Sequence, residues 1–134
     1  MATLLCHIEI NPGKEFEFEE VMKEMYRRTH AEEPNCVRYE YYRAAETNKY
    51  YSLLSFTDRF SFLEHQVSDY HEGFDFAAMI KSIEMEWVDP VTNAAPLIPT
   101  NATDLPDTAS DLIKEAAQVY VIQVQDWWQQ HRKS

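Results

Sequence analysis

The 134-residue chain has few glycines, few cysteines and few basic residues. It holds only two Gly and no GxGxxG or Walker-type motif, which excludes the glycine-rich loops that cradle phosphate groups. Its net charge of −11 repels polyphosphates, so we expect no nucleic-acid partner. No apolar run approaches the ~20 residues that a membrane-spanning helix needs. We therefore expect no membrane partner either.

The two cysteines, Cys6 and Cys36, both fall in segments with the pattern of strands. They are typical of buried thiols in a reducing compartment. The N-terminus does not resemble a signal peptide, because Met1 leads directly into a strand that contains Glu9. These features predict a cytoplasmic protein. The length fits one domain with room for an appendage.

The first half of the chain predicts a strand, a helix and a hairpin. Residues 4–10 alternate between two faces, as a half-buried strand does. Asn11 is a natural N-cap and Pro12 suits the first helical position, so we expect a helix to begin there. An apolar stripe follows at helical spacing: Phe18, Val21, Met22, Met25 and Thr29. Two strands, 36–43 and 50–57, then form a hairpin.

A second helical region covers about residues 59–81, with breaks near Ser68 and Gly73, and residues 82–88 alternate as a fourth strand. The order βαββαβ predicts an α+β, ferredoxin-like fold with an antiparallel sheet and helices on one face. The first two strands carry apolar residues on both faces. We therefore expect a second copy of the chain to cover the free face, making a homodimer.

The composition changes after residue 90. Residues 90–106 are rich in Pro, Asn, Thr and Ala and predict a linker. Thr108 and Asp111 resemble a capping box, and a helical pattern runs on through Trp127 and Trp128 to the basic residues 131–133. The β-branched run 119–122 leaves a strand as an alternative. We thus expect a core of residues 1–90, and a linker and C-terminal helix in residues 91–134 that packs on the core or on the partner subunit.

Three groups of residues carry a family resemblance. They are Pro12-Gly13-Lys14, then Glu33-Pro34-x-Cys36 with Arg38-Tyr39-Glu40, and Asp58-x-x-x-Phe62-x-x-His65 followed by Ser68 and His71. Over about residues 3–90, the chain resembles the antibiotic biosynthesis monooxygenase (ABM) domain family. The resemblance implies a dimeric α+β barrel. It also implies cofactor-independent oxidation of a small phenolic, quinol or polyketide-like substrate by O₂.

The chain departs from the family pattern at informative positions. Leu54 stands where many members carry a Glu, and Asn35 replaces the Gly of the Glu-Pro-Gly turn. Heme-degrading relatives carry an Asn and an axial His where this chain has Cys6 and Asp75. Because Asp is a poor axial ligand for heme iron, heme cleavage is disfavoured. We expect no cofactor.

His65 is the predicted catalytic residue, because an imidazole can accept a proton from a phenol and return it. A helix His that only fills space is the competing interpretation. The predicted substrate-binding residues are Cys6, Tyr39, Tyr41, Phe56, Tyr70, His71 and Trp87. Packing would explain each of them too. The spacing of His65 and Asp69 could hold one ion, but it matches no zinc signature, and we expect no metal.

Two other functions remain open at this stage. The same scaffold could carry a non-oxidative isomerase in which His65 shuttles a proton. It could also be a non-enzymatic ligand-binding or stress-related dimer, because a fold does not determine a function.

Overall fold

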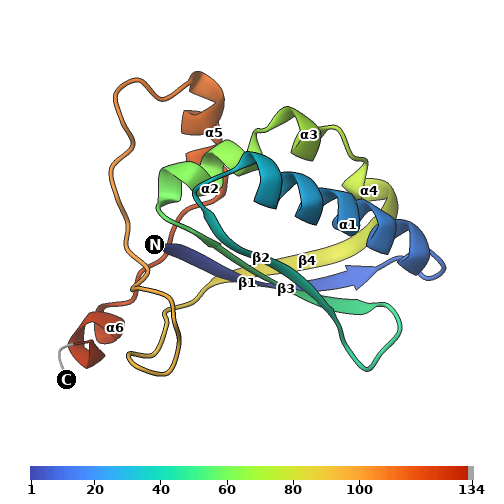
Figure 1. The fold of residues 1–134 in the computed structure, drawn as a ribbon, viewed down its shortest axis with the longest axis horizontal. Helices are drawn as coiled ribbons and strands as arrows, with labels where there is room; N and C mark the ends of the chain where they lie inside the picture. The colour runs from blue at the N-terminus through green and yellow to red at the C-terminus, as the bar shows by residue number, and fades with distance from the viewer. Residues whose placement is uncertain (133–134) are drawn as a thin grey trace.

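The computed structural model describes residues 1–132 (Figure 1). Lys133, the last of the predicted C-terminal basic residues, lies outside them. Ten elements follow one another in the described chain: β1 (Ala2–Ile10), α1 (Glu15–Glu32), β2 (Cys36–Arg43), β3 (Lys49–Phe56), α2 (Arg59–Gln66), α3 (Asp69–Glu72), α4 (Phe76–Met79), β4 (Ile80–Trp87), α5 (Asp111–Val119) and α6 (Asp126–His131).

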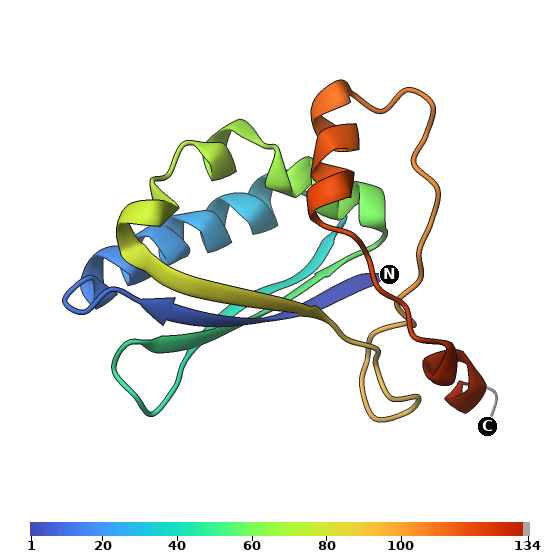
Figure 2. The same ribbon diagram turned by 180° about the vertical axis from the view of Figure 1, so that it is seen from behind.

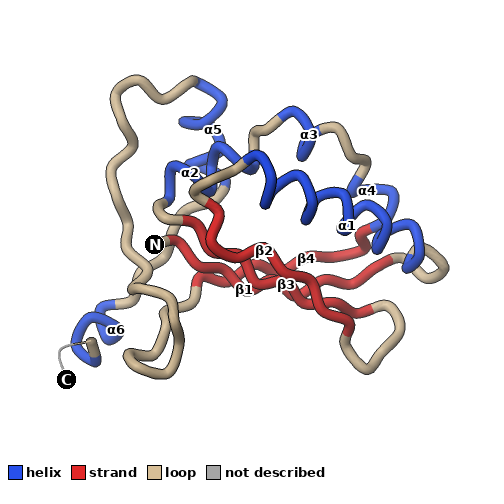
Figure 3. Tube along the Cα trace, in the orientation of Figure 1, coloured by secondary structure: helices blue, strands red, loops and turns tan. Residues whose placement is uncertain are grey.

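The strands form one antiparallel sheet in the order β2-β3-β1-β4. Helices α1 to α5 lie on one side of this sheet, and its other side is bare (Figures 1 and 2). The core is thus the predicted α+β, ferredoxin-like βαββαβ unit, which Figure 3 shows as a sheet below a helical layer.

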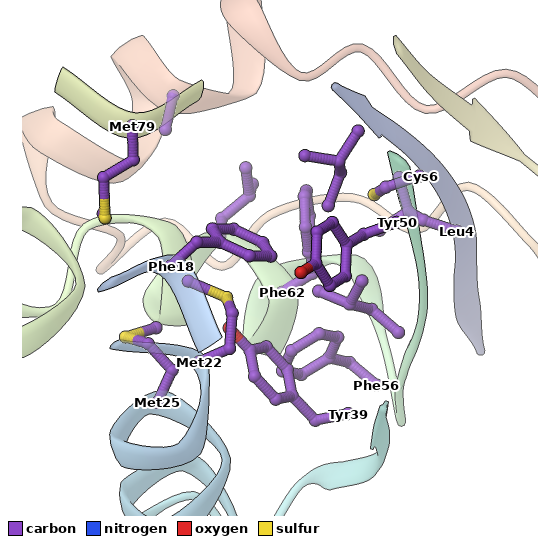
Figure 4. Close-up of a cluster of buried hydrophobic side chains, with 14 of the residues drawn as sticks. Leu4, Cys6, Phe18, Met22, Met25, Tyr39, Tyr50, Phe56, Phe62 and Met79 are labelled. Atoms are coloured by element: carbon purple, nitrogen blue, oxygen red, sulfur yellow. The ribbon is translucent and has the colours of Figure 1, made fainter. Parts of the chain in front are cut away.

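The hydrophobic core lies between α1, α2 and the sheet (Figure 4). The predicted stripe of α1 supplies Phe18, Met22 and Met25, all buried. Tyr39 of β2 and Phe56 of β3 face them from the sheet and are 1% and 0% exposed. Because residues paired across neighbouring strands share a face, the alternation along each strand decides which side chains enter this core.

The opposite face of the sheet, here called the open face, carries a mixture of apolar and charged side chains. Leu5 pairs with Leu53, and His7 pairs with Tyr51, whose ring lies 5.3 Å from the imidazole. Tyr42 and Tyr51 are 54% and 41% exposed on this face. Leu5 and Leu53 are half-buried, so these two tyrosines are the more exposed of the large apolar side chains on the open face.

Helix α1 begins later than the sequence pattern predicts. Asn11 is not its N-cap and Pro12 is not its first residue, because residues 11–14 form a reverse turn closed by the Lys14 N–H bonded to the Asn11 carbonyl at 3.0 Å. Gly13 takes φ +87° in this turn, a conformation that glycine adopts without steric cost. The Asn11 amide instead donates to the Ala78 carbonyl at 3.3 Å.

The second helical region is broken at both predicted places. Asp58 caps α2 by accepting a hydrogen bond from the Ser61 N–H at 2.8 Å. The chain leaves the helix at Val67, and Ser68 precedes the short α3. After Gly73, Asp75 caps α4 through the Ala78 N–H. Each break turns the chain across the helical layer above the sheet.

The C-terminal segment is not one helix. The predicted capping residue Thr108 is replaced by Ser110, whose hydroxyl accepts from the Ile113 N–H. Helix α5 ends at Val119, and residues 120–125 are irregular before α6. The β-branched Val121 and Ile122 disfavour a helix. The Val121 carbonyl instead accepts a hydrogen bond from the Trp87 Nε1–H at 2.9 Å.

A buried ion pair fixes the far end of this segment. The Arg132 Nε–H donates to Asp89 at 3.0 Å, and further guanidinium N–H groups donate to Asn101 and to the Thr100 carbonyl. The side chains of Arg132 and Asp89 are 15% and 10% exposed. Burial raises the pKa of the Asp89 carboxyl, but hydrogen bonds from Arg132 and Thr100 outweigh it and hold the pKa below its ordinary value. The pair thus ties α6 to the end of β4.

We expect Arg132→Ala to release α6 locally. The substitution leaves Asp89 partly buried without its partner, a loss of about 2 kcal/mol for a charged hydrogen-bonded group. Amide hydrogen exchange in residues 126–131 should accelerate at least ~10-fold, while exchange in α1 stays unchanged. Arg27→Ala is the control, since that residue pairs with Glu24 on an exposed helix face. Wild-type exchange rates in α6 of the Arg132 variant would contradict the assignment.

Candidate functional site

A cavity of about 220 Å³ lies between the sheet and the helical layer. Five of the eight predicted site residues line it: Cys6, Tyr39, Tyr41, His65 and His71. The rest of the wall is mostly apolar and includes Leu54, the residue that replaces the family's Glu. A mostly apolar cavity with a few converging polar groups is the usual form of a small-molecule site.

His65 reaches the cavity because α2 turns one face toward the sheet. Phe62, Leu63 and Gln66 are buried on the same helix, and His65 is 1% exposed. Its ring packs against Tyr39 and Phe56, with ring centres 5.0 Å and 5.4 Å away. These aromatic neighbours from β2 and β3 leave the imidazole little freedom to rotate.

The Nδ1 atom of His65 lies 2.8 Å from the Oε2 atom of Glu33. A carboxylate can only accept, so the hydrogen bond requires a proton on Nδ1. In the neutral ring this leaves Nε2 as the nitrogen with a free lone pair. The Tyr70 hydroxyl lies 3.4 Å from the same Nδ1 and 3.0 Å from the Thr29 hydroxyl, which closes the network on that side.

Glu33 is placed by the end of α1. It is the C-cap residue, its N–H donates to the Thr29 carbonyl at 3.0 Å, and its backbone is extended at φ −116° and ψ 92°. Pro34 favours this conformation because it excludes the preceding residue from the helical region. The sequence analysis did not assign Glu33 to the site, although it forms part of the Glu33-Pro34 motif.

His71 brings a second imidazole to the cavity. Its ring centre lies 5.0 Å from that of His65. Its Nδ1 atom is buried without a hydrogen-bond partner, and Glu72 stands 3.6 Å away. Burial lowers the pKa of His71, and the neighbouring charge of protonated His65 lowers it further. His71 therefore favours the neutral form more strongly than a solvent-exposed His does.

Tyr39 and Tyr41 share the cavity face of β2, as the alternation predicts, and their hydroxyls are 3.0 Å apart. Burial raises the pKa of both phenols well above the ordinary value, and proximity to each other contributes in the case of Tyr39. Both therefore stay protonated near neutral pH. One of their two protons is used in the hydrogen bond between the hydroxyls, so the pair can donate one hydrogen bond to an oxygen atom of a ligand.

The Cys6 thiol also faces the cavity but is not poised as a nucleophile. Burial raises its pKa, and a hydrogen bond with Ser52 offsets this only in part. A reactive thiolate needs the opposite shift. Cys6 acts here as a small apolar wall residue.

The other three predicted site residues, Phe56, Tyr70 and Trp87, are not among the residues that line the cavity. Phe56 is fully buried behind the His65 ring, and Tyr70 lies on the Nδ1 side of that ring. Trp87 is on the same face of β4 as Met85 but two residues further along the strand. It pairs with Leu4, whereas Met85 pairs with Cys6, and of these two pairs only Cys6–Met85 lines the cavity. These three residues support the site from outside.

Tyr120 lines the cavity although the sequence analysis did not place it there. The only signal in the sequence is its position in the apolar pattern of the C-terminal segment, which says nothing of where that segment docks.

A larger groove of about 720 Å³ runs between α1 and β2. It is more open than the cavity, and no histidine or cysteine lines it. It shares Phe18, Met22 and Tyr41 with the cavity, so Tyr41 separates the two spaces. The acid–base groups therefore single out the smaller cavity as the candidate site.

Among residues 1–132, no group of three or more His, Cys, Asp or Glu side chains is arranged to hold a metal ion. Asp69, which lies four residues after His65, belongs to α3 rather than α2 and is exposed.

The lowered pKa of His71 predicts a pH dependence of stability. The unfolded chain binds a proton at this residue more readily than the folded chain, so folding stability should fall as the pH drops below about 6.5. Urea unfolding at pH 7 and pH 5 should show a smaller loss for His71→Gln than for the wild type. Glu72, Glu33 and His65 face this group and are unchanged in the variant. An equal loss in both proteins would contradict the assignment.

No helix within residues 1–132 combines the length and the apolar character that crossing a membrane requires. No curated protein sequence matches the chain.

Several solved structures share the fold. A Caulobacter crescentus protein that bears the antibiotic biosynthesis monooxygenase name is 24% identical, with a TM-score of 0.62 over 67% of this chain and 89% of that one. PA3566 from Pseudomonas aeruginosa is 17% identical, with a TM-score of 0.60 over 65% and 90%. Rv0793 from Mycobacterium tuberculosis is 15% identical, with a TM-score of 0.63 over 70% and 98%.

The family model described as "Antibiotic biosynthesis monooxygenase" matches residues 1–75. These residues hold β1 to α3, and they include Glu33, His65 and His71. The chain therefore belongs to the antibiotic biosynthesis monooxygenase family.

Proposed function

We propose that the protein is a cofactor-independent monooxygenase that oxidises a small phenol or quinol with O₂. The observation that carries the proposal is the hydrogen-bonded pair of His65 and Glu33 at the wall of an apolar cavity. The family name supports the reaction class, and the chemistry of the side chains supports the role of each residue.

The reaction begins with transfer of the phenol proton to Nε2 of His65. Glu33 holds the ring orientation and offsets the positive charge that the imidazole gains. The phenolate is electron-rich and donates electrons to O₂. One oxygen atom forms a new bond to a ring carbon and the other leaves as water, so a phenol and O₂ give a quinone and H₂O. The substrate supplies all the electrons, and the reaction needs no external reductant.

Tyr39 and Tyr41 would position the substrate oxygen. Their paired hydroxyls lie on the same cavity wall as the His65 ring, and both stay protonated because burial raises their pKa values. The pair therefore keeps one O–H group free to donate to the substrate oxygen. The apolar wall excludes water, which strengthens these hydrogen bonds and protects the anion.

One observation favours a second candidate. His65 and His71 approach each other at the cavity wall, and two imidazoles could remove a proton at one atom of a carbonyl compound and return it at another. This is the chemistry of an isomerase. Turnover of substrate in the complete absence of O₂ would select the isomerase over the monooxygenase.

We infer further that the protein acts as a homodimer through the open face. Leu5, Leu53 and Tyr51 form an apolar strip that a second copy would cover with the same strip. Cys6 and Cys36 are unpaired, which supports a reducing, cytoplasmic location.

His65→Ala should reduce turnover at least ~10²-fold if the imidazole is the general base. Glu33→Gln should reduce it about 10-fold, because the amide keeps a hydrogen bond but no longer offsets the charge. The measurement is oxygen uptake by metal-stripped protein with a panel of hydroquinones and polyphenols. His131→Ala, in α6, is the control and should retain wild-type uptake.

Wild-type uptake by His65→Ala would remove His65 from the mechanism. Uptake that is abolished by His65→Ala but insensitive to Glu33→Gln would leave His65 as the base and contradict the role of Glu33.

Tyr51→Glu should convert the dimer into a monomer, because it places a charge in the apolar strip, between Tyr42 and His7. Sedimentation velocity measures the change directly. Tyr26→Glu is the matched control, since Tyr26 is 50% exposed on α1 and away from the open face. A Tyr51→Glu protein that still sediments as a dimer would contradict this interface.

A further inference from the structure

The C-terminal extension contributes one side chain to the candidate site. Tyr120 lies 45 positions after the last residue matched by the family model, yet its half-buried side chain lines the same cavity as His65 and Cys6. The extension reaches this place because α5 stands against α2, the helix that carries His65 (Figure 2).

Three contacts hold Tyr120 in position. Helix α5 buries Ile113 and Ala116 in the core, and the Tyr120 N–H closes its last turn by donating to the Ala116 carbonyl at 2.8 Å. The Tyr120 ring meets Phe62 edge to face, with ring centres 5.7 Å apart.

The third contact comes from the sheet. The Trp87 Nε1–H donates to the carbonyl of Val121 at 2.9 Å, and the Trp87 ring also packs against Phe62 at 5.3 Å. The residue after Tyr120 is thus tied to β4. Aromatic packing on Phe62 and the hydrogen bonds on either side of Tyr120 therefore fix this residue in the cavity wall.

Tyr120 lines the cavity together with residues of β4, a strand at the edge of the sheet. The cavity-facing Ile83 of this strand is 50% exposed. The other cavity residues of this strand, Ile80 and Met85, are only half-buried. The ring of Tyr120 therefore adds wall area to a cavity that the family core leaves partly open.

We propose that Tyr120 is a specificity-determining residue that limits the cavity to substrates with a single aromatic ring. A space of about 220 Å³ is below the range of ~300–1,000 Å³ that is typical of sites for drug-sized ligands. Removing the phenol group of Tyr120 would open room for about one further ring. The inference rests on the proposed function, because it takes the His65 cavity as the substrate site.

The first test measures access to the cavity without any substrate. In a Cys36→Ser background Cys6 is the only thiol, and its reaction with the aromatic disulfide 4,4′-dithiodipyridine can be followed by absorbance. Tyr120→Ala should accelerate the reaction at least ~10-fold relative to Tyr120→Phe, which keeps the ring. Val119→Ala, at a neighbouring residue that is 74% exposed, should leave the rate unchanged.

A further control separates access from general loosening of the fold. Met25→Ala removes a buried side chain that does not line the cavity, so it lowers stability without changing the wall. The proposal is overturned if Met25→Ala accelerates the thiol reaction as much as Tyr120→Ala, or if the Ala and Phe variants of Tyr120 react at equal rates.

The second test measures selectivity by ligand size. Binding of hydroquinone and of 1,4-dihydroxynaphthalene is followed anaerobically through the NMR signals of the His65 ring. The wild type and Tyr120→Phe should prefer the single-ring compound by at least ~10-fold, and Tyr120→Ala should lose that preference. An unchanged preference in Tyr120→Ala overturns the assignment.

The two proposals fail in different ways. Size-selective binding that Tyr120 controls, without oxygen uptake, would contradict the proposed reaction and support the role of Tyr120. Oxygen uptake in which all variants prefer one-ring and two-ring compounds equally would support the proposed reaction and contradict the role of Tyr120.

Discussion

The hydrogen bond between His65 and Glu33 connects the parts of the molecule on which the candidate site depends. It joins helix α2 to the end of helix α1, two different elements of the helical layer. Pro34 holds Glu33 in the extended conformation that aims its side chain inward. Tyr39 and Phe56 fix the imidazole from the sheet. The carboxylate favours the tautomer in which Nδ1 carries the proton and Nε2 keeps its lone pair.

The family core and the C-terminal extension divide the work of building this site. Residues 1–75 supply the proposed base, its carboxylate and the paired tyrosines, which are groups that act on a proton or an oxygen atom. The extension supplies Tyr120, which acts through its shape. Trp87 and the ion pair of Arg132 with Asp89 tie the extension to β4 at two places. Members of the family with the same core could thus differ in selectivity through segments outside it.

The sequence predicts the core well because its signals there are local. The period-2 pattern of the strands and the stripe of α1 each follow from residues near one another in the chain, and both are found in the structure. The sequence pattern predicts one C-terminal helix, although the β-branched run 119–122 is a local signal against it. The hydrogen bond from Trp87 to Val121, which holds the irregular segment, could not be predicted because Trp87 is far away in sequence. Glu33 was missed for the same reason: only the docking of α2 brings His65 to it.

Nitrogen NMR of the His65 ring tests the central claim most directly, because the two ring nitrogens report separately whether each carries a proton. We expect neutral His65 to carry its proton on Nδ1, with Nε2 unprotonated, and Glu33→Gln to weaken this preference. A neutral ring protonated on Nε2 in the wild type would contradict it. Nε2 would then be a donor, and it could not take a proton from a bound phenol.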